Sequence, residues 1–178
     1  MQRVAVFGNA GGGKSTLACR LAALTGLPLH VVDMMEFRPG GARVPQDEFL
    51  AAHAQLLRRE RWIIDGFGGA GPAWERFARA DTLIHVDLAL PWHYLGVTHR
   101  LLKGLFVTPA GWPEGSPMWR SSLSSYRVIP LCHRHLTPRY RQLLAEQAGA
   151  KRVHALRSPG QMREFLAAVA RETVTRGG

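Results

Sequence analysis

The sequence has few of the features that mark secreted, disulfide-bonded or membrane-spanning proteins. Its 178 residues include only two cysteines, Cys19 and Cys132, which are too few for a disulfide framework. No stretch approaches the roughly 20 uninterrupted apolar residues that a membrane-spanning helix needs. The first residues also lack a basic segment followed by an apolar segment and a small-residue cleavage site. We therefore expect a cytoplasmic protein with no membrane partner.

Acidic residues are also scarce. The chain has 13 Asp and Glu against 23 Lys and Arg, which gives a formal net charge of +10. A field of this sign attracts anions such as nucleotides, acidic metabolites or nucleic acid. Because the arginines are scattered along the chain, a solvated basic surface and a dedicated nucleic-acid face both remain open.

Repeats and low-complexity segments are absent, and short apolar runs alternate with helix-like segments. The runs are apolar at odd and even positions alike, which is typical of parallel strands covered on both faces. The pattern predicts a single α/β domain over residues 1–178. Expected strands are Arg3–Phe7, Leu29–Val32, Trp62–Ile64, Thr82–Val86 and Arg152–Leu156, and expected helices are Lys14–Leu24, Gln46–Arg59, Trp92–Leu105, Pro138–Gln147 and Gln161–Arg171.

One stretch interrupts this alternation. From Val107 to Ser125 the chain reads VTPAGWPEGSPMWRSSLSS, which is dense in Pro, Gly and Ser. Ordinary connections are shorter, and long ones more often serve as lids or binding loops. We expect a lid-like insertion at about residues 106–125.

A glycine-rich motif follows the first expected strand. Gly8, Gly13, Lys14 and Ser15 give the spacing G-x-x-x-x-G-K-S, between an expected strand and an expected helix. Glycines allow a tight concave loop whose backbone N–H groups point at one centre, where phosphates bind. The predicted phosphate-binding residues are Gly8, Asn9, Ala10, Gly11, Gly12, Gly13, Lys14, Ser15 and Thr16.

The motif predicts a bound nucleoside triphosphate together with a magnesium ion. Lys14 is expected to reach the β- and γ-phosphates, and the Ser15 hydroxyl is expected to ligate Mg²⁺. The cofactors are therefore predicted to be ATP and Mg²⁺. A GTPase is the weaker alternative, because the sequence contains no N-K-x-D guanine motif.

Two further segments carry a family resemblance: VVDMMEFRPG after the second expected strand, and RWIIDGFGGAGPAWERFARADTLIHVD around the third and fourth. With the glycine-rich loop, they resemble the adenylate kinase-like nucleoside and metabolite kinases. The closest likeness is to a bacterial branch labelled DNA topology modulation or adenylate kinase-related proteins. The resemblance implies a three-layer P-loop NTPase fold: a five-stranded parallel sheet of order 2-3-1-4-5, helices on both faces, and a lid.

The same resemblance, together with strand-end placement, suggests the remaining site residues. Asp33 and Asp65 are expected to end the second and third strands, where parallel sheets bind ligands, although both also fit turn-forming roles. Asp33 would accept the proton of an acceptor hydroxyl, and Arg100 would stabilise phosphoryl charge. The predicted acceptor site comprises Asp33, Phe37, Arg38, Asp65, Gly66 and Arg76, and Arg157 is predicted to border the base of ATP.

These residues predict an ATP-dependent phosphotransferase acting on a small acceptor. Catalysis would rest on positioning and on Lys14, Asp33 and Arg100. The alternative is a nucleotide-gated nucleic-acid-binding ATPase with no small-molecule acceptor, which the charge of +10 and the resembled branch suggest.

Overall fold

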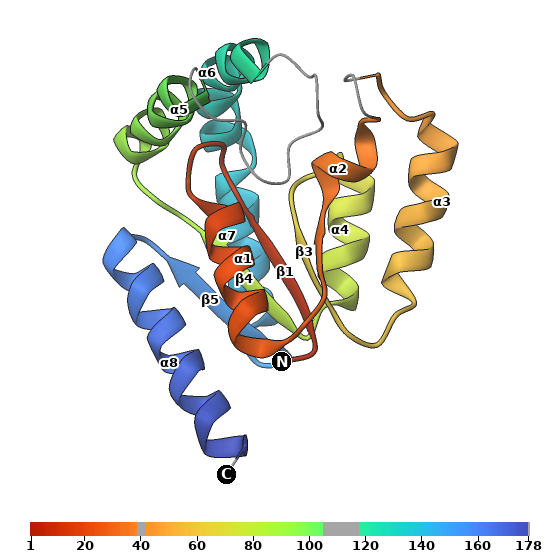
Figure 1. Cartoon of the computed structure of the whole chain (residues 1–178), viewed down its shortest axis with the longest axis vertical. Helices are drawn as coiled ribbons and strands as arrows, with labels where there is room; N and C mark the ends of the chain where they lie inside the picture. The colour runs from red at the N-terminus through yellow and green to blue at the C-terminus, as the bar shows by residue number, and fades with distance from the viewer. Residues whose placement is uncertain (39–41, 105–117, 178) are drawn as a thin grey trace.

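The computed structural model describes residues 1–38, 42–104 and 118–177, and these form a parallel sheet between two layers of helices (Figure 1). The five strands run in the order β2-β3-β1-β4-β5. They are β1 Arg3–Gly8, β2 Leu29–Val31, β3 Trp62–Asp65, β4 Thr82–Val86 and β5 Arg152–Leu156. The helices are α1 Lys14–Thr25, α2 Val32–Glu36, α3 Gln46–Leu57, α4 Ala70–Arg79, α5 Leu90–Gly104, α6 Met118–His135, α7 Thr137–Gln147 and α8 Pro159–Gly177. The expected fold is confirmed.

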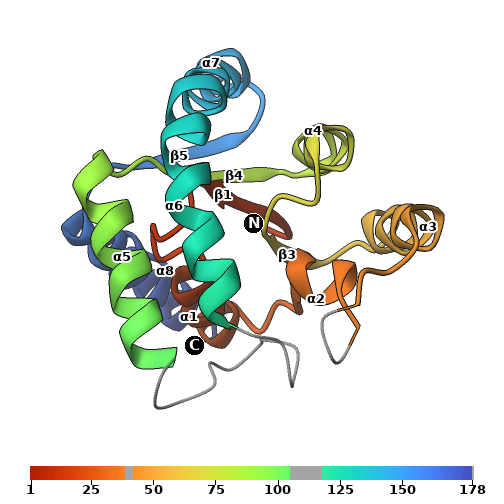
Figure 2. The same ribbon diagram turned by 90° about the horizontal axis from the view of Figure 1, so that it is seen from above.

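The side chains of each strand alternate between two cores, as a sheet covered on both faces requires. Ala5 and Phe7 of β1 pack with α3, α4 and α7, whereas Val4 and Val6 pack with α1 and α8. Figure 2 shows α4 and α7 on one side of the sheet and α1 and α8 on the other. Both parities of β1 are therefore buried.

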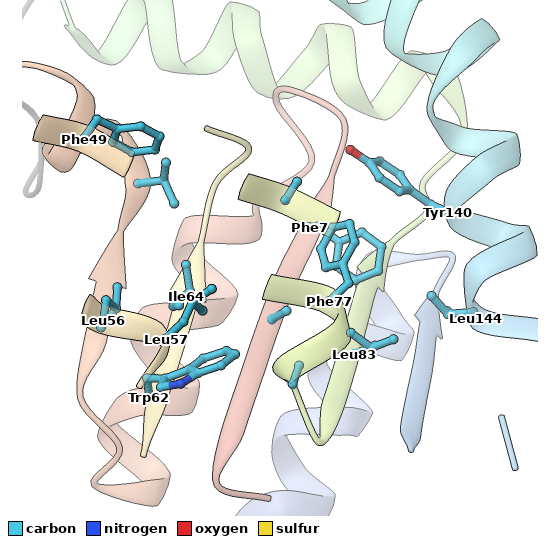
Figure 3. Close-up of a cluster of buried hydrophobic side chains, with 14 residues drawn as sticks. Phe7, Phe49, Leu56, Leu57, Trp62, Ile64, Phe77, Leu83, Tyr140 and Leu144 are labelled. Atoms are coloured by element: carbon cyan, nitrogen blue, oxygen red, sulfur yellow. The ribbon is translucent and has the colours of Figure 1, made fainter. Parts of the chain in front are cut away.

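An aromatic cluster fills the middle of the first core. The rings of Phe7 and Phe77 lie 4.4 Å apart, and Tyr140 meets Phe7 edge-on at 4.9 Å. Figure 3 shows these three rings between β1, β4 and α7. Tilted and edge-on ring pairs contribute beyond the area that they bury. The cluster packs the sheet against the helices that cover this face.

The amino ends of the strands are held together by polar contacts. Both carboxylate oxygens of Asp81 accept hydrogen bonds from the backbone N–H of Gln2, and one accepts from Arg3, at 2.8 to 3.2 Å. These bonds and that from the Thr82 hydroxyl outweigh burial and lower the pKa of Asp81. Lys151 donates to the carbonyl oxygens of Phe77 and Ala78, both at 2.6 Å, at the end of α4. Both termini lie at this end of the molecule (Figure 1).

Three helices were not predicted from the sequence, and in each case a feature of the sequence explains why. Helix α2 has only five residues, α4 begins AGPAWERFAR with Gly and Pro in its first turn, and α6 contains Pro130. Proline is tolerated in a first turn, and inside a helix it removes one hydrogen bond without always ending the helix. Residues 118–125 of the expected lid-like insertion belong to α6, and residues 106–117 lie outside the described part of the chain.

No helix in the described ranges combines the length and the hydrophobicity that crossing a membrane requires.

Candidate functional site

The glycine-rich loop connects β1 to α1 at the carboxyl end of the sheet, as the motif predicts. Gly11 has φ 72°, a left-handed conformation that side chains other than glycine rarely adopt. A Cβ at Gly11 would also overlap the backbone carbonyl oxygen of His93 in α5. Only glycine fits here, because the loop turns sharply while it touches the backbone of a helix.

Three backbone N–H groups of the loop are available to a ligand, whereas that of Ala10 donates to the Asn9 side chain at 2.8 Å. Within the described ranges, no acceptor meets the N–H groups of Gly11, Gly12 or Gly13, and Lys14 donates to the Asn9 carbonyl oxygen at 2.8 Å. Helix α1 begins at Lys14, and its amino end adds a partial positive charge to the loop. Free amides, a helix dipole and an ammonium group fit the phosphates of a nucleotide.

Ser15 and Asp65 form the part of the site that fits a magnesium ion. Parallel pairing places Asp65 opposite Val6, and the Ser15 hydroxyl donates to the Asp65 carboxylate at 2.6 Å. Asp65 is 2% exposed, and its other oxygen, Oδ1, has no partner in the described chain. Buried acceptors are rarely left unpaired. A hydroxyl beside an unpaired buried carboxylate oxygen suits Mg²⁺, which keeps several bound waters.

Asp33 lies in a helix and not, as was expected, at the end of a strand. Strand β2 ends at Val31, so Asp33 is the second residue of the short helix α2 and does not end a strand. It nevertheless reaches the same end of the sheet, because α2 follows β2 directly. Its side chain is open to solvent on one side, and the elements around it still remove part of its hydration. This desolvation is the largest influence and raises the pKa of Asp33; Lys14 opposes it, Asp65 reinforces it and Arg100 opposes it.

Arg100 joins this group from α5. Its guanidinium donates to the Ser125 hydroxyl of α6 at 2.8 Å. Burial lowers the pKa of Arg100, and the negative charge of Asp33 opposes that shift. The structure therefore brings Lys14, Asp33, Asp65 and Arg100 into electrostatic contact from four different elements.

The expected acceptor residues fall into two groups. Phe37 pairs with Arg43 through a backbone bridge, and the guanidinium of Arg43 lies 5.6 Å from the Phe37 ring centre. Arg38 is exposed and paired with Glu48 at 2.8 Å. Glu36 lies one helical turn after Asp33 on α2, and burial followed by the charge of Asp33 raises its pKa. This side of the site therefore carries two acidic groups.

The second group lies at the β3–α4 turn. Arg76 is fully buried and donates to the carbonyl oxygens of Gly66 and Phe67 at 2.7 and 3.3 Å. Burial lowers its pKa to about 10. In the described chain its Nε and Nη1 atoms have no hydrogen-bond partner. Arg76 thus holds the turn from its buried side, because the two carbonyl oxygens point toward its guanidinium group.

Arg157 lies at the carboxyl end of β5, close to Asp87. The Asp87 carboxylate receives two hydrogen bonds from Arg141 at 2.8 and 2.9 Å, and Arg157 Nε lies 3.9 Å away. Ser158 accepts from the backbone N–H of Gln161 at 3.1 Å and so caps α8. Asp87 therefore anchors the region where the base of a nucleotide was expected.

Two contacts of the loop were not visible in the sequence. The Asn9 side chain donates to the Ile129 carbonyl oxygen of α6 at 2.8 Å. On the other side, the His93 ring of α5 lies against the Ala10 carbonyl oxygen at 2.9 Å. Both join residues that are far apart in the chain, so no local spacing could indicate them.

Cys132, His133 and His135 are potential metal ligands that lie close together in the sequence. Among the described residues, no cluster of three His, Cys, Asp or Glu side chains is placed to hold a metal ion.

Comparisons with known proteins give a likeness in structure alone. No protein-family model matches the sequence, and no curated protein matches it. A shikimate kinase from Acinetobacter baumannii, solved in complex with shikimate, superposes with a TM-score of 0.59 and 17% identity, covering 99% of this chain and 94% of that one. A gluconokinase from Sinorhizobium meliloti 1021 gives a TM-score of 0.47 and 19% identity, covering 98% and 94%. The chain therefore shares the fold of the superposed shikimate kinase, with five parallel strands in the order β2-β3-β1-β4-β5.

Proposed function

We propose that this protein transfers the γ-phosphoryl group of ATP to a hydroxyl group of a small acceptor. The observation that carries the proposal is the contact between Ser15 and Asp65, because it joins the glycine-rich loop to an unpaired buried carboxylate oxygen at one end of the sheet. Bound Mg²⁺ would neutralise phosphate charge there. Ser15 would ligate the ion, and Asp65 would hold its waters.

The chain's own residues supply positioning and charge. The backbone of Gly8 to Gly13 would hold the phosphates, and Lys14 would leave the Asn9 carbonyl oxygen to contact them. The acceptor oxygen forms a bond to the γ-phosphorus, the bond from that phosphorus to the bridging oxygen breaks, and ADP leaves. Asp33 takes the hydroxyl proton, and Arg100 faces the charge that spreads over the phosphoryl oxygens.

The acceptor would lie between α2 and the β3–α4 turn. Phe37, Arg38 and Gly66 border that space, and Arg76 acts through the turn it supports. Arg157 would border the base of ATP. The P-loop kinases include the superposed shikimate kinase, whose substrate carries hydroxyl groups, and this supports a hydroxylated acceptor here.

Lys14→Ala tests the nucleotide site. We expect ATP affinity to fall by about tenfold or more, because an ammonium group facing phosphates is lost. Calorimetric titration with Mg·ATP measures this, and Arg20→Ala, an exposed change on the same helix, should bind as wild type does. A screen of sugars, small acids and nucleoside monophosphates for acceptor-dependent ADP release then identifies the substrate. Wild-type ATP affinity in Lys14→Ala would contradict the proposal.

A second candidate is a nucleotide-gated nucleic-acid-binding ATPase, favoured by charge at the opposite end of the molecule. Arg3, Arg61 and Arg152 are exposed at the amino ends of the strands. Arg61 and Arg152 line a cavity of about 170 Å³, which Glu172 also lines. Nucleic acids bind such surfaces through their phosphates, and the release of counterions from the phosphates favours binding.

Salt dependence separates the two candidates. If nucleic acid is the partner, DNA affinity should fall steeply with added salt, and the variant with Arg3, Arg61 and Arg152 all changed to Ala should lower the logarithmic slope by about 3. ATP hydrolysis should also rise with DNA. Turnover that needs a small hydroxylated acceptor and ignores DNA would remove this candidate.

A further inference from the structure

His93 of α5 is a buried polar residue that contacts the phosphate-binding loop. Its side chain is 2% exposed. The Nδ1 atom lies 2.9 Å from the Ala10 carbonyl oxygen, and the Nε2 atom lies 3.1 Å from the Leu88 carbonyl oxygen. A Cβ at Gly12 would lie 3.0 Å from His93 Cε1, so the ring also packs against the loop itself.

A neutral imidazole ring cannot form hydrogen bonds to both of these carbonyl oxygens. A carbonyl oxygen only accepts, so each ring nitrogen needs a hydrogen to form its bond. Neutral histidine carries one N–H, whereas the protonated ring carries two. In the neutral ring, one nitrogen lone pair therefore faces an oxygen lone pair. Protonation converts that repulsion into a second hydrogen bond, so that the ring is bonded to both the loop at Ala10 and the β4–α5 connection at Leu88.

The charges around His93 disfavour its protonated form when no phosphate is bound. Burial is the largest influence and lowers the pKa of His93, while its two carbonyl contacts oppose that shift. Lys14 on α1 and His133 on α6 lower it further. His85 on β4 also interacts with His93 electrostatically. A polyphosphate bound at the loop would reverse the sign of the local field, because it brings several negative charges beside Lys14.

We propose that His93 is a positioning residue of the phosphate-binding loop, and that its ring takes up a proton when a nucleoside triphosphate binds. The inference rests on the proposed ATP binding and adds to it a coupling between nucleotide affinity and pH. The proton on Nδ1 or Nε2 completes the pair of bonds that fix the Ala10 carbonyl group. The loop is then held from α5 while its N–H groups meet the phosphates.

The test compares His93→Asn with wild type. Asn can keep a donor near the Nδ1 position and cannot titrate, so it separates the bond from the charge. The exposed His99→Asn on the same helix is the matched control. Each protein is titrated with Mg²⁺ and the β,γ-imido analogue of ATP, in buffers of different ionisation enthalpy, between about pH 5.5 and 8. Protons that the analogue itself exchanges cancel in the difference between proteins.

Wild type and His99→Asn should take up nearly one more proton than His93→Asn does. Their affinity should rise relative to His93→Asn by up to about tenfold for each pH unit of acidification, within the window between the free and bound pKa of His93. Equal proton uptake in wild type and His93→Asn would overturn the inference while leaving ATP binding intact. If wild type does not bind the analogue at all, the proposed function fails, and this inference fails with it.

A second measurement does not depend on the variant's folding. ¹⁵N NMR of wild-type imidazole groups should show His93 neutral in the free protein and carrying two N–H groups in the complex at about pH 7. A ring that stays neutral in the saturated complex would overturn the inference.

Discussion

At the scale of single residues, Asp33 gives the sharpest prediction for chemistry. If it accepts the acceptor proton, Asp33→Asn should lower turnover by about 10² to 10⁴-fold and leave ATP affinity within about threefold. Because partial desolvation raises its pKa, wild-type turnover should fall as the pH drops through that raised pKa, where the carboxylate becomes protonated. Rates of acceptor-dependent or basal ATP hydrolysis across pH measure both effects. Asp47→Asn, exposed on α3, should behave as wild type, and a variant of Asp33 with normal turnover would exclude it as the base.

The sequence predicts single residues well where one short segment holds all of the chemistry. Gly11 needs its conformation within its own loop, so the motif indicates it directly. Asp33 was placed at a strand end, and it lies in a helix because β2 closes two residues earlier. His93 could be found only from the structure, since its partners Ala10 and Leu88 are set by how α5 packs.

At the scale of elements, the contact between α5 and the loop depends on a glycine. A Cβ at Gly96 would overlap the carbonyl oxygen of Gly11, so Gly96→Ala must push α5 and the loop apart. We expect ATP affinity to fall at least about tenfold, although Ala favours a helix over Gly by about 1 kcal/mol. Calorimetric titration and urea unfolding measure the two effects. Gly71→Ala in α4, where a Cβ meets nothing within 4 Å, is the control, and unchanged affinity in Gly96→Ala would contradict the packing argument.

Strands were predictable where a short apolar run lies between helix-like segments. Thr82–Val86 and Arg152–Leu156 are strands with the expected bounds. The first part of α6, residues 118–125, falls within the expected insertion, because its serines are poor helix formers. The helix forms because its buried face, which includes Ile129 and Cys132, packs beside α5.

At the scale of the whole molecule, buried histidines predict instability in acid. Burial is the largest cause that lowers the pKa of His30, His53, His93 and His154, and it lowers that of His85 to about 4. The unfolded chain binds protons near pH 6.5, so this stabilisation is complete above that pH and is lost as the pH falls toward 4. His85 alone accounts for up to about 3 kcal/mol. Urea unfolding across pH measures the slope.

A control distinguishes buried from exposed histidines. The variant with both His99→Asn and His135→Asn changes two exposed rings and should keep the wild-type dependence on pH. A midpoint of unfolding that is constant between about pH 7 and 5 would contradict the assignment of buried neutral histidines.

The overall strand order came from the family resemblance, because alternation of strands and helices is compatible with several parallel sheets. What no pattern predicts is the distribution of charge at the two ends of that sheet. Arg3, Arg61 and Arg152 come together at the amino ends only because parallel pairing aligns the starts of β1, β3 and β5.

The loop's attachment on both flanks has a thermodynamic consequence. Asn9 is bonded to α6 and Ala10 contacts α5, so these helices cannot separate without breaking a bond at the loop. Opening of the helix pair and disordering of the loop should then occur as one cooperative event. Amide protons of α5 and α6 should exchange with solvent more slowly, and by the same factor, when a triphosphate saturates the protein.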